Sequence, residues 1–388
     1  MRYNKIFKHS LIAYLLGTLS AYAFLNIPLM LASLGVGIFI CVRYFEIHQL
    51  KQSGEKKITI FLAASIIPPI LLSPISAYKS PESLYFIFSS CVAILIAFLS
   101  GQRLADALSA LRITLVIVLL ILFFYIINNY SENPFPLEDF LQGAGSSNVV
   151  TSFLVVLQVA YSAITFIYSS KITWMTPLAT FAICIVGYGR GSILASLMLL
   201  LTLMLIHTFR MRRSIKNTIF IGISVLILCL LSSIYYTDVL SVIANNSKLG
   251  LGLVDDSRLM MINDYLAKLD GASLLLGSSY LGTSIEILFG NNPHNSFIRA
   301  HHMMGAFYLL FILSLPIFSI LIQRNWLMFF SSIAFFVIII FRAFSEPILF
   351  PTPIDYYFYI IIFCLVKKTS ERSKNHISNA KFSYNIKG

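Results

Sequence analysis

Long apolar runs dominate this chain, and each is about the length that one helix needs to cross a membrane. The hydrocarbon core of a bilayer takes roughly 20 apolar residues of helix. Such runs predict about twelve helices, at 8–24, 27–45, 58–78, 84–100, 110–128, 149–169, 172–188, 191–208, 217–236, 304–322, 326–342 and 354–366. The pattern therefore predicts an all-α, polytopic integral membrane protein.

Two polar segments interrupt the apolar pattern on the side opposite to the N-terminus. We expect 129–148 to be a short ordered lid, whereas 237–303 is too long for a connector and is the default place for function. Within the long loop, one apolar face predicts an amphipathic helix at 258–270, with Ile262, Tyr265, Leu266 and Leu269 spaced at i, i+3, i+4 and i+7. That face either packs on the membrane domain or lies in the lipid headgroup layer.

These segments divide one membrane domain into four parts. Residues 1–236 hold the first nine helices, 237–303 form the long loop, 304–366 hold the last three helices, and 367–388 form a basic tail that we expect to be solvated and flexible. If the N-terminus lies in the cytoplasm, most of the 28 basic residues fall on the cytoplasmic side. This bias predicts that both termini are cytoplasmic and that the long loop lies on the outer side of the membrane.

Composition agrees with a membrane protein and excludes some function classes. Hydrophobic residues make up 58% of the chain and charged residues only 11%, whereas a soluble domain carries roughly a quarter charged residues. The net charge of +12 follows from the bias toward cytoplasmic basic residues. We expect no nucleic-acid partner, because no basic stripe with interleaved aromatic residues lies outside the membrane.

The segment 291–299, NNPHNSFIR, is the sharpest local feature of the long loop. A proline followed by a polar residue and an amphipathic run predicts a helix start, which places His294 at the outer membrane boundary. A neutral imidazole there can take a proton from a hydroxyl. The alternative is that His294 is a plain hydrogen-bonding residue of a loop.

A metal centre is not expected. His294 and His301 are seven residues apart, and Ile298 stands where the i, i+4 spacing of a zinc site requires a second histidine. We interpret His301 and His302 as polar residues of the interfacial layer. The five cysteines all stand in apolar runs and show no metal or redox spacing. The sequence calls for no cofactor.

Arg190 stands between two apolar runs, in the glycine-rich segment 187–192. A charge there is costly and calls for a partner or a function. Arginine matches phosphate oxygens bidentately, and the neighbouring glycines would let a ligand approach closely. The alternative is an arginine whose head group snorkels to the interface.

Three more arginines face the same outer side. Arg258 opens the loop helix, Arg299 follows His294, and Arg342 ends a membrane helix. An internal ion pair of Arg342 with Glu346 is the simpler interpretation of that last arginine. Several cations with one histidine suit an anionic, lipid-linked substrate, although a non-catalytic lipid-binding protein would show the same pattern.

In its predicted topology and in the order of these residues, the chain resembles the bacterial O-antigen polymerase and O-antigen ligase superfamily. That family has ten to fourteen helices and one large periplasmic loop in its second half. The stretch Gly189-Arg190-Gly191-Ser192 resembles its motif of small residues with an arginine, and Arg258 resembles its second arginine. Pro293-His294-Asn295 resembles its His-Asn motif, with Gly305 as the downstream glycine. The motifs are short and confined to 187–305, so their order and topology carry the resemblance.

The resemblance implies a metal-independent glycosyltransferase whose donor is a glycan on undecaprenyl pyrophosphate. Arg190 and Arg258 would hold the pyrophosphate, and His294 would act as general base on an acceptor hydroxyl. Asn295, Arg299 and Arg342 are candidates for assisting roles, and no family role is carried over to Arg299 or Arg342. The resemblance also implies a bacterial inner membrane protein whose active site faces the periplasm. Partners would be the lipid-linked oligosaccharide, membrane lipid and a chain-length regulator protein.

Three alternatives stay open. A polymerase extends another lipid-linked repeat unit, whereas a ligase transfers the glycan to the lipid A core; we favour the polymerase because such enzymes are far more numerous. A flippase for lipid-linked sugars would more often show two related halves and charged or broken helices at mid-membrane. A non-enzymatic lipid-binding protein predicts that His294 is dispensable.

Overall fold

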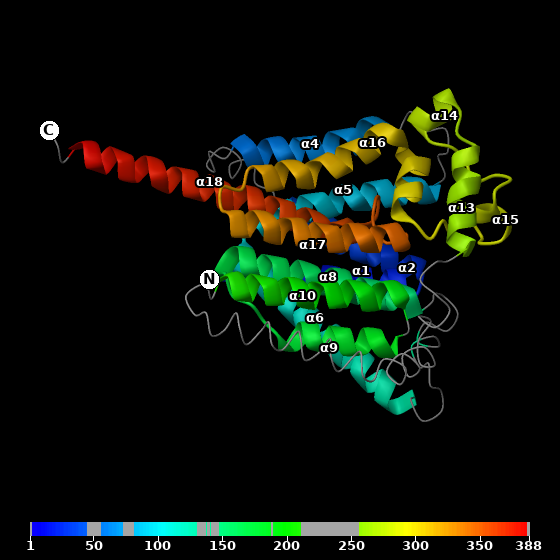
Figure 1. The fold of residues 1–388 in the computed structure, drawn as a ribbon, viewed down its shortest axis with the longest axis horizontal. Helices are drawn as coiled ribbons and strands as arrows, with labels where there is room; N and C mark the ends of the chain where they lie inside the picture. Colours follow the sequence, from blue (N-terminus) through cyan, green and yellow to red (C-terminus); the bar gives the residue numbers. More distant parts are fainter. Residues whose placement is uncertain are drawn as a thin grey trace.

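The computed structural model describes residues 2–44, 56–72, 81–129, 137, 140, 147–187, 189–210 and 256–385. All regular elements in this described part are helical (Figure 1). The helices are α1 (Arg2–Ala23), α2 (Ile27–Tyr44), α4 (Lys56–Leu72), α5 (Pro81–Gln102), α6 (Leu104–Asn129), α8 (Ser147–Ser169), α9 (Met175–Val186), α10 (Arg190–Arg210), α13 (Asp256–Ala267), α14 (Gly271–Leu276), α15 (Ser284–Ile287), α16 (Ser296–Leu321), α17 (Trp326–Ser345), the 3₁₀ turn η2 (Pro353–Asp355) and α18 (Tyr356–Asn385).

Seven helices of the described part are long and apolar enough to cross a membrane: α2, α5, α6, α8, α10, α16 and α17. Two shorter apolar helices, at Ile58–Leu71 and Met175–Val186, match two further predicted spans. These lengths and compositions confirm a polytopic, helical membrane protein. The helix predicted at 217–236, most of the loop segment before α13 and most of the proposed lid lie outside the described residues, so twelve crossings stay a prediction.

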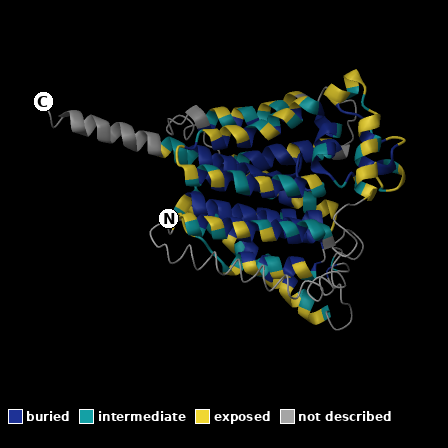
Figure 2. Cartoon of the chain, viewed as in Figure 1, coloured by how far each residue is buried: buried dark blue, intermediate teal, exposed yellow. Residues whose placement is uncertain are grey.

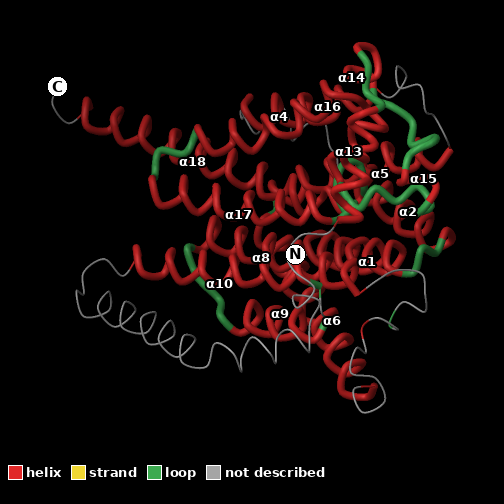
Figure 3. The backbone as a smooth tube through the Cα atoms, turned by 45° about the vertical axis from the view of Figure 1, so that its right-hand side comes forward, coloured by secondary structure: helices red, strands yellow, loops and turns green. Residues whose placement is uncertain are grey.

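The long helices lie side by side, with α13, α14 and α15 gathered at one end of the bundle (Figures 1 and 3). We call residues 256–295, which include these three helices, the cap. The N-terminus and the far end of α18 lie at the opposite end of the bundle (Figure 1). The cap therefore covers the end of the bundle that the sequence assigns to the outside.

The core sits between α8, α5 and the first part of α18. All described residues of α18 from Tyr356 to Val366 are buried, and α18 packs on α5 and α8. Figure 2 shows this buried centre, whereas α6 and α16 carry exposed apolar side chains such as Phe124 and Leu310. Apolar residues on the outer helix faces are what a lipid environment selects.

Helix α18 differs from the sequence expectation beyond Val366. We expected a flexible basic tail from Lys367, but the helix continues to Asn385. Lys367 donates to the carbonyl oxygens of Gly101 and Gln102 at 3.2 and 3.0 Å, which ties this part of α18 to the end of α5. A lysine at a helix C-terminus meets carbonyls that have no intrahelical partner.

The cap has a small core of its own. Met261 and Tyr265 of α13 are buried together with Tyr280, Ile285 and Ile298. The amphipathic helix predicted at 258–270 is thus confirmed, and it begins two residues earlier. Ile262 and Leu269 pack against this cluster, but Leu266 is 55% exposed, so the apolar face packs within the cap along only part of its width.

Two glycines allow the backbones of the cap and of α16 to come into close contact. Gly305 interrupts the helix with φ +77°, and a Cβ there would collide with the carbonyl oxygen of Leu275 in α14. Gly277 has φ +93°, and a Cβ there would collide with the carbonyl oxygen of His301. Only glycine combines such φ values with such close approach at low cost. The helix predicted at 304–322 therefore begins earlier, at Ser296, and bends at Gly305.

Candidate functional site

A cavity of about 550 Å³ opens at the cap end, between α10, α13, α17 and the segment before α16. Arg190, Arg258, His294 and Arg342 line it together with Glu346. We call it the arginine cavity. The three residues that the resemblance singled out, Arg190, Arg258 and His294, come from distant parts of the chain and share this one cavity.

Each of these side chains is held by a different element. Arg190 is the first residue of α10, Arg258 lies in the first turn of α13, and Arg342 lies in the last turn of α17. His294 sits in the loop before α16 with φ +45°. Left-handed backbone is uncommon outside glycine, and where a structure holds a side chain in it the site is a candidate for function.

Glu346 is the carboxylate of the cavity. Arg258 Nη2 donates to Glu346 Oε1 at 2.9 Å, and His294 Nδ1 lies 3.7 Å from Glu346 Oε2. The Glu346 side chain is only 2% exposed, so its charge requires the nearby cations. Neither His294 Nδ1 nor Glu346 Oε2 has a hydrogen-bond partner among the described residues, so the two groups lie near each other without a direct hydrogen bond.

The expected ion pair of Arg342 with Glu346 does not form, and each residue has another partner. Arg342 donates to Ser345 Oγ at 2.8 Å and to Ser152 Oγ of α8, while Arg258 makes the ion pair with Glu346. Gly191 packs directly against this arginine, because a Cβ there would collide with the Arg342 guanidinium. Gly191 thus makes room for a buried arginine, and it also lines the arginine cavity.

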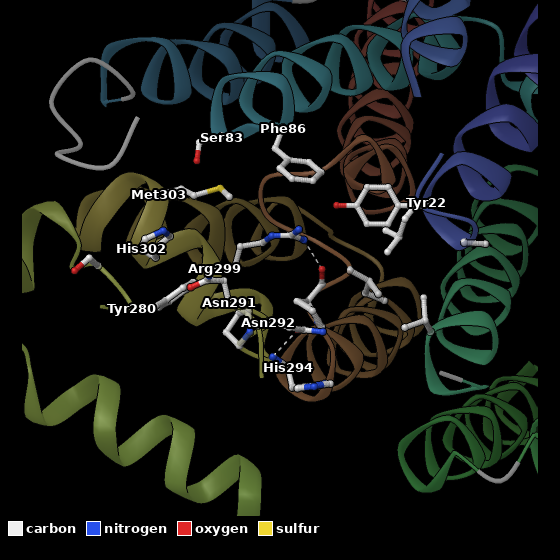
Figure 4. A pocket seen from close by; sticks show the side chains of 18 of the residues that line it. Tyr22, Ser83, Phe86, Tyr280, Asn291, Asn292, His294, Arg299, His302 and Met303 are labelled. Atoms are coloured by element: carbon white, nitrogen blue, oxygen red, sulfur yellow. Dashed lines mark hydrogen bonds between the residues drawn. The ribbon is translucent and has the colours of Figure 1, made fainter. Parts of the chain in front are cut away.

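Arg299 and Asn295 take other places. Asn295 is the N-cap of α16 and accepts from the backbone N–H groups of Phe297 and Ile298 at 2.8 and 3.1 Å, although its side chain also borders the arginine cavity. Arg299 lies in a second cavity of about 690 Å³, which His294 also lines (Figure 4). Arg299 stacks over the Phe86 ring at 4.6 Å and donates to the Pro347 carbonyl oxygen.

His301 and His302 both form hydrogen bonds to the cap. His301 Nδ1 meets the Tyr265 hydroxyl at 2.8 Å, and its Nε2 meets the Leu274 carbonyl oxygen at 2.8 Å. His302 Nδ1 donates to the Ser278 carbonyl oxygen at 2.6 Å. In the described ranges no cluster of three or more potential metal ligands occurs.

Glu346 is a candidate site residue that the sequence pattern did not reveal. Its position four residues after Arg342 indicated a local pair, and nothing in the spacing pointed to α13 or to the loop before α16. Asn292 is a second case, because its Oδ1 accepts the backbone N–H of His294 at 3.1 Å and so helps to hold the left-handed turn. An asparagine two residues before a turn residue is the only sequence signal for it.

A comparison of the sequence with protein-family models and with curated proteins gives no match. The resemblance to the O-antigen polymerase and ligase superfamily therefore stays a prediction. The chemistry of the arginine cavity is an independent line of reasoning. Clustered guanidinium groups beside an imidazole suit an anionic ligand that undergoes a proton-coupled reaction.

Proposed function

We propose that this protein polymerises O-antigen or a similar surface polysaccharide on the periplasmic side of a bacterial inner membrane. It would transfer a glycan from undecaprenyl pyrophosphate to a sugar hydroxyl of another lipid-linked repeat unit. One observation carries the proposal: Arg190, Arg258 and His294 line a single cavity at the cap end of a membrane helix bundle.

The walls of the arginine cavity suit both parts of such a donor. Arg190 and Arg258 offer the planar donor sets that match phosphate oxygens. Leu194, Phe341 and Phe344 line the same cavity, and Phe344 is 56% exposed. An apolar opening beside guanidinium groups supports entry of a polyprenyl chain from the membrane with its pyrophosphate against the arginines.

The reaction follows from these positions. The acceptor hydroxyl oxygen forms a bond to the anomeric carbon of the donor, while the bond from that carbon to the pyrophosphate oxygen breaks. His294 takes the hydroxyl proton, and Glu346 stabilises the imidazolium that results. Undecaprenyl pyrophosphate leaves with the bonding electrons, and Arg190 and Arg258 balance its developing charge.

A deletion strain tests the proposal. Its lipopolysaccharide should carry lipid A core with a single repeat unit, and the wild-type gene should restore the ladder on a gel whereas a His294→Ala variant at equal protein level should not. Bare core with accumulating long lipid-linked glycan would instead identify the ligase. An unchanged ladder, with every other surface polysaccharide of the strain also at its wild-type length, would contradict both the polymerase and the ligase.

A further inference from the structure

The second cavity shares part of its wall with the arginine cavity. It is bounded by the end of α1, by α5, by cap residues 279–294 and by α16. Tyr22, Phe86 and Tyr280 supply its aromatic walls, so we call it the aromatic cavity (Figure 4). Pro293 and His294 line both cavities, so one imidazole borders both.

The lining of the aromatic cavity differs from that of the arginine cavity. It holds the side-chain amides of Asn291 and Asn292 and one arginine, Arg299, whose guanidinium is already stacked on Phe86 and bonded to Pro347. None of its described lining residues is an aspartate or a glutamate. Aromatic faces with a few amide and hydroxyl groups suit an uncharged polyhydroxylated ligand better than a pyrophosphate.

Tyr280 points to a ligand independently of this composition. Its side chain is only 7% exposed, and its hydroxyl has no hydrogen-bond partner among the described residues. The ring is held firmly, because it stacks on His302 with centroids 4.0 Å apart and meets Tyr265 edge-on at 5.8 Å. Buried hydroxyls are normally paired, so a rigid, unpaired one in a cavity wall is a candidate ligand contact.

Burial also defines the chemical form of this hydroxyl. Removal from water raises the pKa of Tyr280 well above its usual value, so the phenol stays protonated at physiological pH. A protonated phenol can donate one hydrogen bond through its O–H and can accept one at its oxygen, and a sugar hydroxyl can be the partner in either. Tyr22 faces the same space, with its hydroxyl toward the Arg299 guanidinium (Figure 4).

We propose that the aromatic cavity binds the acceptor glycan, with Tyr280 and Asn291 as its hydrogen-bonding contacts; this inference rests on the proposed function. The donor pyrophosphate would lie in the arginine cavity, and the acceptor hydroxyl would approach His294 from the aromatic cavity. Two substrates that meet at one imidazole from separate cavities are positioned for reaction without competing for the same groups.

Two variants test the acceptor site in the purified full-length protein. Tyr280→Phe removes only the hydroxyl, and Asn291→Gly removes the amide while keeping the positive φ of +66°. Tyr359→Phe is the matched control, because Tyr359 is also buried with a hydroxyl that lacks a partner among the described residues, yet it lines neither cavity. Lipid-linked repeat units extracted from the deletion strain serve as substrate, and undecaprenyl pyrophosphate serves as a probe without glycan.

Tyr280→Phe and Asn291→Gly should each slow chain extension about fivefold at subsaturating substrate, the effect of one lost hydrogen bond. Both should bind undecaprenyl pyrophosphate as tightly as the wild type, which also shows that they fold, and Tyr359→Phe should change neither property. Wild-type extension rates in both variants, or weakened undecaprenyl pyrophosphate binding in both, would overturn the acceptor site.

Other variants test the proposed function separately from the acceptor site. If Arg190→Ala and Arg258→Ala bind undecaprenyl pyrophosphate like the wild type and His294→Ala extends chains at full rate, the donor site and the base are both wrong. If these three variants fail as expected while the Tyr280 and Asn291 variants behave like the wild type, only the acceptor site is wrong.

Discussion

The two cavities that meet at His294 are built in different ways. The arginine cavity is rich in charge, because Arg190, Arg258 and Arg342 line it together with the buried Glu346, which pairs with Arg258. The aromatic cavity contains one arginine, Arg299, which stacks on Phe86, and its remaining lining includes aromatic rings and side-chain amides. Under the proposed function, the arginine cavity would hold the anionic leaving group and the aromatic cavity would hold the neutral nucleophile.

The largest expected effect is at the residue that the two cavities share. We expect His294→Gln to lower chain extension by about 10²- to 10⁴-fold, the range that general acid–base catalysis contributes. Binding of undecaprenyl pyrophosphate should change little, because the arginines remain. His207→Gln, at the far end of α10, is the control. An active His294→Gln enzyme would remove the base from the mechanism.

The arginines of the first cavity come next. Arg190→Ala and Arg258→Ala should each lower extension about 10²-fold and weaken undecaprenyl pyrophosphate binding, since one charge-assisted contact is worth roughly 1.5–3 kcal/mol. Lysine variants should recover part of the loss, because lysine keeps the charge without the bidentate geometry. Arg112→Ala, on the exposed side of α6, should be neutral. Equal losses at Arg112 would mean that any arginine variant disturbs the protein.

A smaller effect is expected at Glu346. Glu346→Gln keeps the shape of the side chain but removes the charge that faces Arg258 and His294. We expect extension to fall about tenfold, with a lower kcat rather than a weaker apparent substrate affinity, because Glu346 acts through His294. An unchanged kcat would show that the carboxylate serves only to hold the cap.

At the junction of the cap and α16 we expect the smallest effect on activity, so the quantity to measure there is stability. Gly305→Ala should lower the free energy of unfolding by about 1–3 kcal/mol, because alanine is strained at φ +77° and its Cβ would collide with Leu275. Gly35→Ala, with nothing within 4 Å of the added Cβ, is the control in a thermal unfolding series. Equal stability of the Gly305 variant would argue against a tightly docked cap.

Much of the helical architecture could be predicted from the sequence. Apolar runs of spanning length need no tertiary information, because lipid demands that each segment satisfy its own backbone. The amphipathic spacing of Tyr265 with Ile262 and Leu269 likewise located α13. The continuation of α18 past Lys367 was missed, because a polar, basic sequence lacks the apolar signal that defines a span.

The site was harder to predict than the fold. Arg190, Arg258 and His294 were candidates on local grounds and on the resemblance, but periodicity does not bring distant segments together. The pairing of Glu346 with Arg258 joins residues 88 positions apart, which no local pattern contains. The aromatic cavity was missed altogether, because Tyr22, Phe86 and Tyr280 meet only in the folded bundle.

The most direct test of the central claim is an in vitro reaction with purified protein, extracted lipid-linked repeat units and a chelator, without nucleotide sugar. We predict that each new glycosidic linkage releases one undecaprenyl pyrophosphate, and that Arg190→Ala and His294→Ala both stop the release. No polymer from the wild type, or equal release from the two variants and the wild type, would contradict a donor site formed by Arg190 and Arg258 with His294 as the base.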